Sequence, residues 1–579
     1  MPNALKWKGL QIVDLLRQKR LVNIFTLLTV CFLALTGRLW YVQIGQGNLY
    51  AGLALEQVSH WVPLEETARG EILDRNLVPL TGTKEETRII VFPGAVGDKA
   101  EVSRGLAEIL GLDTALVSDY LQGDPCTLPF LPTPGQASSI QNRGWTGVMA
   151  FPVKYRYGDR RLAAQVIGHV GKISSWQEFV DLSRQTGKLY RFGDLVGKAG
   201  LEKYYEGDLK GSWPQKAVRV FADARGNLLG GPGFLVDERA GDSGRQDLVL
   251  TLDARIQEIV EDVMDKKVDK GAVVVMEAGS GEILALASRP GVNPELAGND
   301  GASAGGSYFD HCTALYQPGS IFKLVVAAAA LEEGIITPAD RFTCTGEKDR
   351  LVPCWNKEGH GELDFRQAFA ESCNPVFAKI GLELGADKVI EYARRLGLDN
   401  QSIGGYPVPA DPRQDLNLIA APYNLAGCSV GQGPVLVTPI QIAAMTNTFL
   451  TDGMYQEPCL VKEIRSGTGK GEQARPPEEV RAMSPSTAGV MRSLLEEVTA
   501  NGSGREAMVP VHGSAGKTGS AQIANNKGLV NAWFTGYAPL TQSRYIITVL
   551  VEDGESGSKT AAPVFKEIME QVLALPDVF

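Results

Sequence analysis

The chain has 579 residues, of which 44% are hydrophobic and 21% are charged, and its formal net charge at pH 7 is −10. This length predicts two or more domains, because a single hydrophobic core stops growing at about 250–300 residues. The net negative charge, without a basic stripe interleaved with aromatic residues, excludes a nucleic-acid-binding protein.

The first predicted element is an apolar segment at residues 21–44, which begins LVNIFTLLTV and ends YVQI. About 20 apolar residues cross a bilayer, and basic residues favour the cytoplasmic side of such a helix. Five Lys and Arg residues lie in 1–20. The pattern therefore predicts a cytoplasmic tail at 1–20, a single transmembrane helix at 21–44 and an extracytoplasmic remainder. A cleaved signal peptide has a shorter apolar core and a small-residue cleavage site, and a buried helix does not need the basic flank.

Residues 45–240 are mixed and polar and are predicted to form a separate domain that ends after the glycine-rich segment 230–233. This part shows no nucleophile–base pair, phosphate loop or metal-ligand spacing. One group of charged residues suggests either an active site or an ion-pair cluster: Arg69, Glu71, Asp74 and Arg75. The ion-pair cluster is favoured, because charges spaced this closely usually tie a turn or linker together.

Residues 241–579 have the pattern of an α+β domain. A short strand and an amphipathic helix are expected in 247–268, and a β-hairpin in 271–288 with its turn at Gly279–Gly281. Further elements are expected near the C-terminus, as strands at 516–523, 531–540 and 544–553 and a helix at 562–575. The prediction is an antiparallel sheet of about five strands built from both ends of the domain, with a helical insert.

The cysteines leave two interpretations open. Cys31 lies in the apolar segment, which leaves seven of the eight cysteines outside it. Cys344 and Cys354 are close enough in sequence to form a disulfide at an exported location, and the alternative is that both are buried free thiols. Cys354 and His360 lack the paired, short-spaced ligands that are typical of zinc sites, so no metal site is predicted.

A serine and a lysine stand at the start of an apolar helix predicted after Pro318 and Gly319. Helix capping accounts for Ser320, but the positive end of the helix dipole disfavours a charged Lys323. A Ser-x-x-Lys pair also occurs at 514–517 and 556–559, so the spacing alone is weak evidence. Only Ser320 and Lys323 stand at a helix start, where an i, i+3 spacing brings both side chains to one face.

Two further motifs follow in the same domain: a Ser-x-Asn unit in ESCNP (371–375) and a Lys-Thr-Gly unit in GKTGS (516–520). Alone, the first is a helix-capping turn and the second a turn into a strand. In this order, the three units match the Ser-x-x-Lys, Ser-Asp-Asn and Lys-Thr-Gly set of penicillin-binding proteins and class A β-lactamases. More distant stretches carry the same likeness: RGEILDRN, GLEKYYEGDLKG, SVGQGPVLVTPIQIAA and AWFTGYAP.

The chain thus resembles the class B penicillin-binding proteins, which are membrane-anchored peptidoglycan transpeptidases. The resemblance implies a penicillin-binding/β-lactamase-like transpeptidase domain at 241–579 behind an elongated α+β pedestal, or dimerisation, domain at 45–240. Two positions depart from the family pattern: Ser520 replaces a frequent Thr, and HCTAL (311–315) stands where Asn-Arg-Ala is common. No catalytic group is lost at either position.

The mechanism requires a base for Ser320, and no histidine lies near the motifs, so Lys323 is the candidate. Its pKa would have to fall by about three units, and burial and the nearby Lys517 both act in that direction. The family implies that Ser320 attacks the carbonyl between two D-alanines of a stem peptide. The family also implies that Ser372 relays a proton and that Asn374 binds an amide of the substrate. Lys517, Thr518, Gly519 and Ser520 are implied to surround the terminal carboxylate of the substrate. The N–H groups of Ser320 and Ser520 are implied to form the oxyanion hole.

The implied partners are peptidoglycan stem peptides as donor and amine acceptor, β-lactams that acylate Ser320, the membrane, and a membrane glycosyltransferase. Neither a metal nor an organic cofactor is implied. Three alternatives compete: a serine β-lactamase, a β-lactam sensor and a scaffold with a degenerate site. A β-lactamase needs neither anchor nor pedestal, a sensor needs more cytoplasmic machinery than 20 residues, and a degenerate site is disfavoured by three intact motifs.

Overall fold

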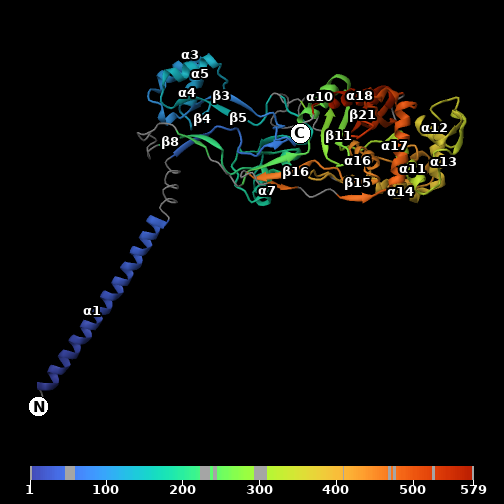
Figure 1. Ribbon diagram of the computed structural model, residues 1–579. Helices are drawn as coiled ribbons and strands as arrows, with labels where there is room; N and C mark the ends of the chain where they lie inside the picture. The colour runs from blue at the N-terminus through green and yellow to red at the C-terminus, as the bar shows by residue number, and fades with distance from the viewer. Residues whose placement is uncertain are drawn as a thin grey trace. The chain divides into compact units, whose positions relative to one another are not determined.

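The computed structural model describes residues 3–45, 59–158, 160–221, 235–238, 244–292, 309–408, 410–466, 471–473, 478–523 and 528–576 (Figure 1). The chain divides into two compact units. The first comprises Met1–Leu64, Glu86–Val153 and Lys216–Glu238, and the second Glu65–Glu85, Lys154–Gln215 and Arg239–Phe579. The glycine-rich segment at 230–233 and the domain boundary expected at residue 240 fall outside the described residues, and that boundary stays a prediction.

The N-terminal helix α1 runs over Asn3–Trp40 and continues into a π-helical turn, η1, at Tyr41–Gly45. Within it, Lys19–Ile44 has the length and composition to cross a membrane. The hydroxyl groups of three threonines in this stretch donate to carbonyls four residues earlier, which satisfies polar groups that lipid cannot. The structure therefore supports an N-terminal membrane helix, and its orientation stays a prediction.

The remainder of the first unit contains two small sheets. Strands β1 (Ser59–Pro63), β8 (Lys216–Phe221) and β9 (Leu235–Glu238) form one in the order β1-β8-β9, and β3 (Lys84–Val91), β4 (Cys126–Thr127) and β5 (Val148–Tyr155) form the other in the order β4-β3-β5. The remaining elements are η2 (Pro93–Ala95), α3 (Lys99–Leu110), α4 (Thr114–Tyr120) and α5 (Pro134–Arg143). Side-chain oxygens of Asp98, Asp113 and Thr133 cap the three α-helices, and their apolar faces pack on the second sheet.

The second unit begins with segments that precede residue 241. They contain β2 (Ile72–Leu73), α6 (Ala164–Ile167), β6 (Val170–Lys172), α7 (Trp176–Thr186), β7 (Leu195–Gly197), α8 (Gly200–Tyr204) and α9 (Glu206–Leu209). Strand β2 pairs in parallel with β10 (Gln246–Leu250), in a four-stranded sheet of order β17-β16-β10-β2 with β16 (Val461–Ser466) and β17 (Gly471–Gln473). The short strand expected in 247–268 is therefore confirmed as β10. It belongs to this four-stranded sheet and not to the five-stranded sheet of the transpeptidase domain.

Buried charges hold these segments together. Arg69 is 1% exposed and its guanidinium lies 2.6 Å from a carboxylate oxygen of Glu202 and 2.6 Å from one of Glu206. Glu202 also accepts from Arg156 at 2.5 Å and from the Tyr157 hydroxyl at 3.0 Å. Burial raises the pKa of Glu202, but the two arginines outweigh it and the carboxyl keeps a lowered pKa. Arg69 is therefore in an ion-pair cluster, as predicted, but its partners are Glu202 and Glu206. Glu71 and Arg75 of the predicted cluster form separate pairs, with Lys154 and Glu282.

The predicted five-stranded sheet is confirmed. Its order is β12-β11-β21-β20-β19, all antiparallel, formed by β11 (Gly271–Glu277), β12 (Ile283–Arg289), β19 (Ala515–Gln522), β20 (Val530–Ala538) and β21 (Tyr545–Gly554). Helices α10 (Ala254–Lys267) and α18 (Ala562–Leu573) cover one face, and the helical insert covers the other. Both faces are buried, which explains why these strands read as continuous apolar runs.

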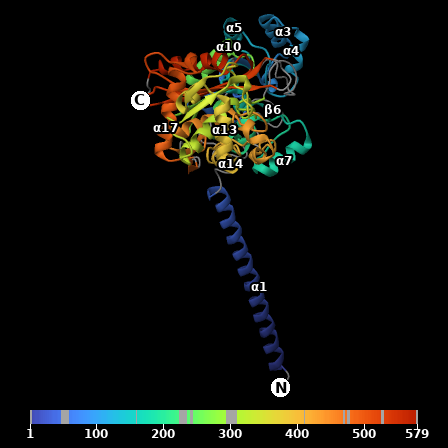
Figure 2. The same ribbon diagram turned by 90° about the vertical axis from the view of Figure 1, so that its right-hand side faces the viewer.

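The helical insert occupies the chain between β12 and β19, and α13, α14 and α17 face the viewer in Figure 2. Its elements are η3 (Gly319–Phe322), α11 (Lys323–Glu332), β13 (Arg341–Cys344), η4 (Gly346–Lys348), β14 (Gly361–Asp364), α12 (Phe365–Ala370), α13 (Asn374–Leu384), α14 (Ala386–Arg395), η5 (Leu416–Ala420), α15 (Asn424–Cys428), α16 (Pro439–Leu450), β15 (Met454–Gln456), β18 (Glu479–Arg481), α17 (Pro485–Ala500) and η6 (Arg505–Ala507). Residues 323–330 of α11 are all buried, so this helix is apolar because neighbours surround it.

Candidate active site

The chain enters α11 through a 3-10 turn and not through a capped α-helix. Gly319 has φ 54°, and a Cβ built on it would lie 2.9 Å from the backbone of Ser520 on β19. Its N–H donates to the Gly431 carbonyl at 3.0 Å. No side chain caps η3 or α11, so the expectation that Ser320 is a helix cap was wrong. The turn instead presents Ser320 as a half-buried hydroxyl close to β19.

Lys323 is fully buried at the start of α11, and its amine lies at the centre of the first two motifs. Nζ is 2.7 Å from the Ser372 carbonyl oxygen, 3.2 Å from Ser372 Oγ and 2.7 Å from Asn374 Oδ1. Burial lowers the pKa of Lys323 to about 7. A neutral amine is therefore available near neutral pH, as a base must be. No hydrogen bond among the described residues joins Ser320 to Lys323.

Ser372 and Asn374 lie at the turn between α12 and α13. Ser372 is buried and has φ 54°, in the left-handed region. This conformation costs a non-glycine residue about 1–2 kcal/mol. Its N–H donates to the Phe369 carbonyl at 3.1 Å, and Lys323 holds its carbonyl. Asn374 opens α13 and its amide donates to the Pro353 carbonyl at 3.1 Å. The turn thus aims both polar side chains at one amine.

The Lys-Thr-Gly motif lies on β19, which is the edge strand of the five-stranded sheet. Lys517 is fully buried, and burial lowers its pKa, with a further lowering from the charge of Lys323. Gly519 lets β19 approach the turn that precedes Lys323. A Cβ at Gly519 would lie 2.8 Å from Ile321 and 2.9 Å from the Pro318 carbonyl oxygen. The hydroxyl of Ser520 accepts from the Gly557 N–H at 3.0 Å and keeps its own proton to donate.

Ser503 is a site residue that the sequence analysis missed. Its hydroxyl lies 2.9 Å from Thr518 Oγ1 and donates to the Ala370 carbonyl at 3.1 Å. It therefore connects the Lys-Thr-Gly strand to the end of α12, just before the Ser-x-Asn turn. In the sequence it stands only as a serine between two glycines, and no local pattern distinguishes such a residue from an ordinary loop serine.

The serines of the two other Ser-x-x-Lys pairs have structural roles. The Ser514 hydroxyl is buried and joins the Ala507 carbonyl to the Val509 N–H. Ser556 accepts from the Lys559 N–H, and the side chain of Lys559 forms an ion pair with Glu555 at the surface. Only the pair at 320–323 combines a half-buried hydroxyl with a fully buried amine.

The three motifs therefore meet: a nucleophilic hydroxyl, a desolvated lysine, a Ser-x-Asn turn and the edge of a β-strand. These are the parts that a serine acyltransferase requires. The model for the penicillin-binding protein transpeptidase domain matches residues 271–570, and that for the penicillin-binding protein dimerisation domain matches residues 64–231. The chain belongs to the penicillin-binding protein transpeptidase family.

Several known proteins are similar to this chain, three of them over nearly its whole length. Stage V sporulation protein D of Bacillus subtilis is 30% identical over 96% of this chain and 85% of its own length. The peptidoglycan D,D-transpeptidase MrdA of Salmonella typhimurium is 26% identical over 96% of each chain. A solved structure from work on the structural coordination of polymerization and crosslinking by a peptidoglycan synthase complex is also similar. One of its chains superposes with a TM-score of 0.70 at 25% identity, over 97% of this chain and 99% of that one. The D,D-transpeptidase domain of an Eggerthella lenta peptidoglycan glycosyltransferase is 27% identical, with a TM-score of 0.52 over 62% of this chain and 95% of that one.

Proposed function

We propose that this penicillin-binding transpeptidase cross-links peptidoglycan stem peptides through an acyl-enzyme on Ser320. The observation that carries the proposal is the position of the Lys323 amine, fully buried within 3.2 Å of Ser372 Oγ and one helical turn after Ser320. Desolvation lowers the pKa of this amine to about 7, so that a large share of it is uncharged near neutral pH, which suits a general base and does not suit a structural ion pair.

In the first half-reaction, Lys323 takes the proton of Ser320, and Oγ attacks the carbonyl carbon between two D-alanines. The N–H groups of Ser320 and Ser520 stabilise the oxyanion. The peptide C–N bond then breaks, a proton passes from Lys323 through the Ser372 hydroxyl to the leaving amine, and terminal D-alanine departs. Lys323 touches the Ser372 hydroxyl at 3.2 Å, which supports this relay.

In the second half-reaction, an amine of a neighbouring stem attacks the ester carbon and gives a proton to Lys323. The ester C–O bond then breaks, and Lys323 passes the proton to Ser320 Oγ, which restores the free hydroxyl. Asn374 holds a substrate amide throughout. The substrate peptide lies along β19, because an edge strand offers unpaired backbone groups. Its terminal carboxylate is then surrounded by residues of that strand: Lys517, Thr518, Gly519 and Ser520. β-Lactams place their own acyl group and carboxylate on the same atoms and remain on Ser320.

The membrane helix gives this activity a location. We place residues 1–20 in the cytoplasm, the span at 21–44, the pedestal at 45–240 and the transpeptidase domain at 241–579 outside the membrane, in line with the basic flank. A membrane glycosyltransferase is the proposed partner, which would supply glycan strands to the cross-linking site. The likeness to a chain from a peptidoglycan synthase complex supports this pairing.

The test of the proposed function is covalent labelling of the detergent-solubilised full chain with a fluorescent penicillin. One label per chain is expected, and digestion should locate it on Ser320. The Ser320→Ala variant should lose the label, whereas Ser556→Ala, which alters another Ser-x-x-Lys pair, should keep it. Labelling that persists in Ser320→Ala would show that another residue is the nucleophile.

A further inference from the structure

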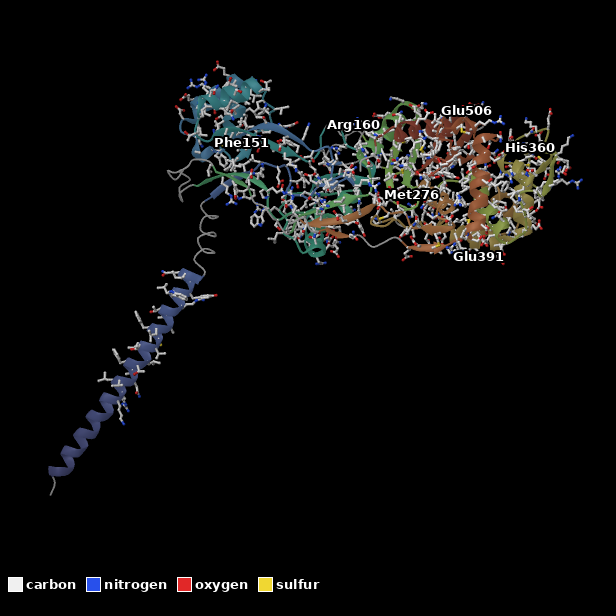
Figure 3. All side chains as sticks on the ribbon, viewed as in Figure 1. Phe151, Arg160, Met276, His360, Glu391 and Glu506 are labelled. Carbon is white, nitrogen blue, oxygen red and sulfur yellow. The ribbon has the colours of Figure 1, made fainter. Side chains whose placement is uncertain are left out.

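Four metal-ligating side chains converge beside the Ser-x-Asn turn: Cys344, Cys354, His360 and Cys373. Each offers one donor atom, and the four atoms all lie within 4.8 Å of one another. Figure 3 labels His360 in the region of α12 and α13. The three cysteines are 0–5% exposed, and all are free thiols. None of the four is the nucleophile, the base or a carboxylate-binding residue, although Cys373 stands between Ser372 and Asn374 in the sequence.

The donor set has the composition and nearly the dimensions of a structural zinc site. Three thiolates and one imidazole form a closed tetrahedral Zn²⁺ site, in which Zn–S and Zn–N distances near 2.3 and 2.0 Å place the donors about 3.5–3.8 Å apart. Cys354 Sγ already lies 3.5 Å from His360 Nδ1. The widest separation exceeds the tetrahedral value by about 1 Å. Rotation of short side chains covers that difference without moving the backbone.

The sequence hides this set because its spacing is irregular. Nine residues separate Cys344 from Cys354, five separate Cys354 from His360, and twelve separate His360 from Cys373. The antiparallel β13–β14 pair places Cys344 opposite Gly361, next to His360, and the turn before α13 supplies Cys373. Spacing in the sequence groups only Cys354 with His360, and the fold brings Cys344 and Cys373 to them as the two further ligands.

The loop that carries two of the donors has little else to stabilise it. Of residues 345–360, only Gly346 and Cys354 are buried, and Trp355 is 59% exposed. Loops of this length without a core of their own are uncommon in compact domains. A metal ion supplies the missing interaction, because it bonds to groups on the loop, the hairpin and the turn at once.

We propose that Cys344, Cys354, His360 and Cys373 bind one Zn²⁺ ion that fixes the Ser-x-Asn turn to the loop beside it. The soft thiolate donors and tetrahedral geometry favour zinc over magnesium or calcium. Binding replaces the thiol protons, which pass to solvent, with bonds to the metal. The site is structural, since all four positions are filled by protein.

The consequence for the active site follows from the contacts around Cys373, which lies between Ser372 and Asn374. The Asn374 amide donates to the Pro353 carbonyl at 3.1 Å, and the Trp355 indole donates to the Glu371 carbonyl at 2.9 Å. The loop and the turn therefore meet on both sides of the cluster. Zinc holds this junction, and the Lys323 contacts depend on it. This consequence rests on the proposed function, whereas the metal site itself does not.

The test measures zinc in the full chain, purified in detergent under reducing conditions and incubated with Zn²⁺ before removal of the excess. About one zinc ion per chain is expected by elemental analysis, with thiolate-to-metal charge-transfer bands after exchange with Co²⁺. Cys344→Ser and His360→Ala should lose the metal. Cys459→Ser, which alters a buried cysteine outside the cluster, should retain it. His360→Cys keeps four ligands and should also retain it, which separates ligand loss from general damage to the fold.

Wild-type chain that holds no more zinc than Cys344→Ser would overturn the site, as would a disulfide between two of the cluster cysteines in the native protein. Penicillin labelling tests the second half of the proposal. Removal of zinc by a chelator should slow labelling at least about ten-fold, and added zinc should restore it. A full complement of zinc with an unchanged labelling rate after its removal would overturn the link to the Ser-x-Asn turn. Failure of the zinc-loaded wild type to label would count against the proposed function instead.

Discussion

At the scale of single residues, the chemistry depends on the protonation state of Lys323, whose pKa burial lowers to about 7. The rate of penicillin acylation should rise with pH through about 7, because the neutral amine is the form that accepts the serine proton. Stopped-flow or timed labelling between about pH 5.5 and 9 measures this profile. Lys559→Ala, which alters the surface Ser-x-x-Lys pair at 556–559, should leave the profile unchanged. A rate that does not vary across this range would refute Lys323 as the base.

The same residue predicts a pH-dependent stability. The folded pKa of Lys323 lies below the ordinary lysine value of about 10.4, so between these values the unfolded chain binds the extra proton. The free energy of unfolding of the wild type therefore gains up to about 1.4 kcal/mol per pH unit from this group as the pH rises through that window. Lys323→Met removes the group, so its stability relative to the wild type should be greatest below pH 7 and decline towards pH 10. A pH-independent difference in denaturant unfolding would contradict this.

Ser503 provides a residue-scale test of the Lys-Thr-Gly strand. Ser503→Ala removes the hydroxyl that lies between Thr518 Oγ1 and the Ala370 carbonyl. Loss of about 1 kcal/mol of hydrogen bonding should lower the acylation rate constant about five-fold. Ser543→Ala also removes a side-chain bond to a backbone carbonyl, but outside the site, and should not change the rate. An equal loss of melting temperature in both variants, with a loss of rate only in Ser503→Ala, would assign positioning to Ser503.

At the scale of elements, strands and helices with a regular apolar period could be predicted from the sequence. The hairpin of β11 and β12 and the strands β19 to β21 lie where their patterns place them. The 3-10 turn at Ser320 could not be predicted, because it depends on the close approach of Gly319 to β19, about 200 residues later. The position of Ser503 in the site and the grouping of Cys344 with Cys373 could not be predicted either, because both depend on contacts between residues far apart in the sequence. Local periodicity reports which face of an element is buried, but not which distant element covers it.

The two ends of the η3–α11 segment allow a matched test of that close approach. Gly319 and Gly334 both have positive φ, 54° and 68°. A Cβ at Gly319 would lie 2.9 Å from the Ser520 backbone, whereas a Cβ at Gly334 meets nothing within 4 Å. Gly334→Ala should cost about 1 kcal/mol of stability and leave penicillin labelling intact. Gly319→Ala should also displace the turn from β19 and slow labelling at least about a hundred-fold. Equal labelling of the two variants would show that this contact does not position Ser320.

At the scale of the whole molecule, the second compact unit contains Glu65–Glu85 and Lys154–Gln215 together with the transpeptidase sheet. These segments are polar in sequence, and no hydrophobic period identifies them as part of that unit. The buried network around Arg69 joins these segments to each other, because the Glu202 and Glu206 carboxylates share one guanidinium. The parallel pairing of β2 with β10 joins them to the chain after residue 241. A charge network of this kind fixes a specific arrangement, because each buried charge is tolerated only with its partners in place.

This network predicts that a change far from Ser320 in sequence destabilises the unit that carries it. Arg69→Met leaves the fully buried Glu202 with one arginine in place of two and Glu206 without its ion-pair partner, so a loss of about 3–5 kcal/mol is expected. Arg160→Met breaks the exposed pairs with Glu258 and Asp262 and should cost less than about 1 kcal/mol. The measurement is the temperature at which the full chain loses penicillin labelling. Arg69→Met should lose it several degrees lower than Arg160→Met, because the labelled serine and the buried arginine unfold with the same unit. Identical temperatures would mean that the segments before residue 241 unfold independently of the sheet that carries Lys517.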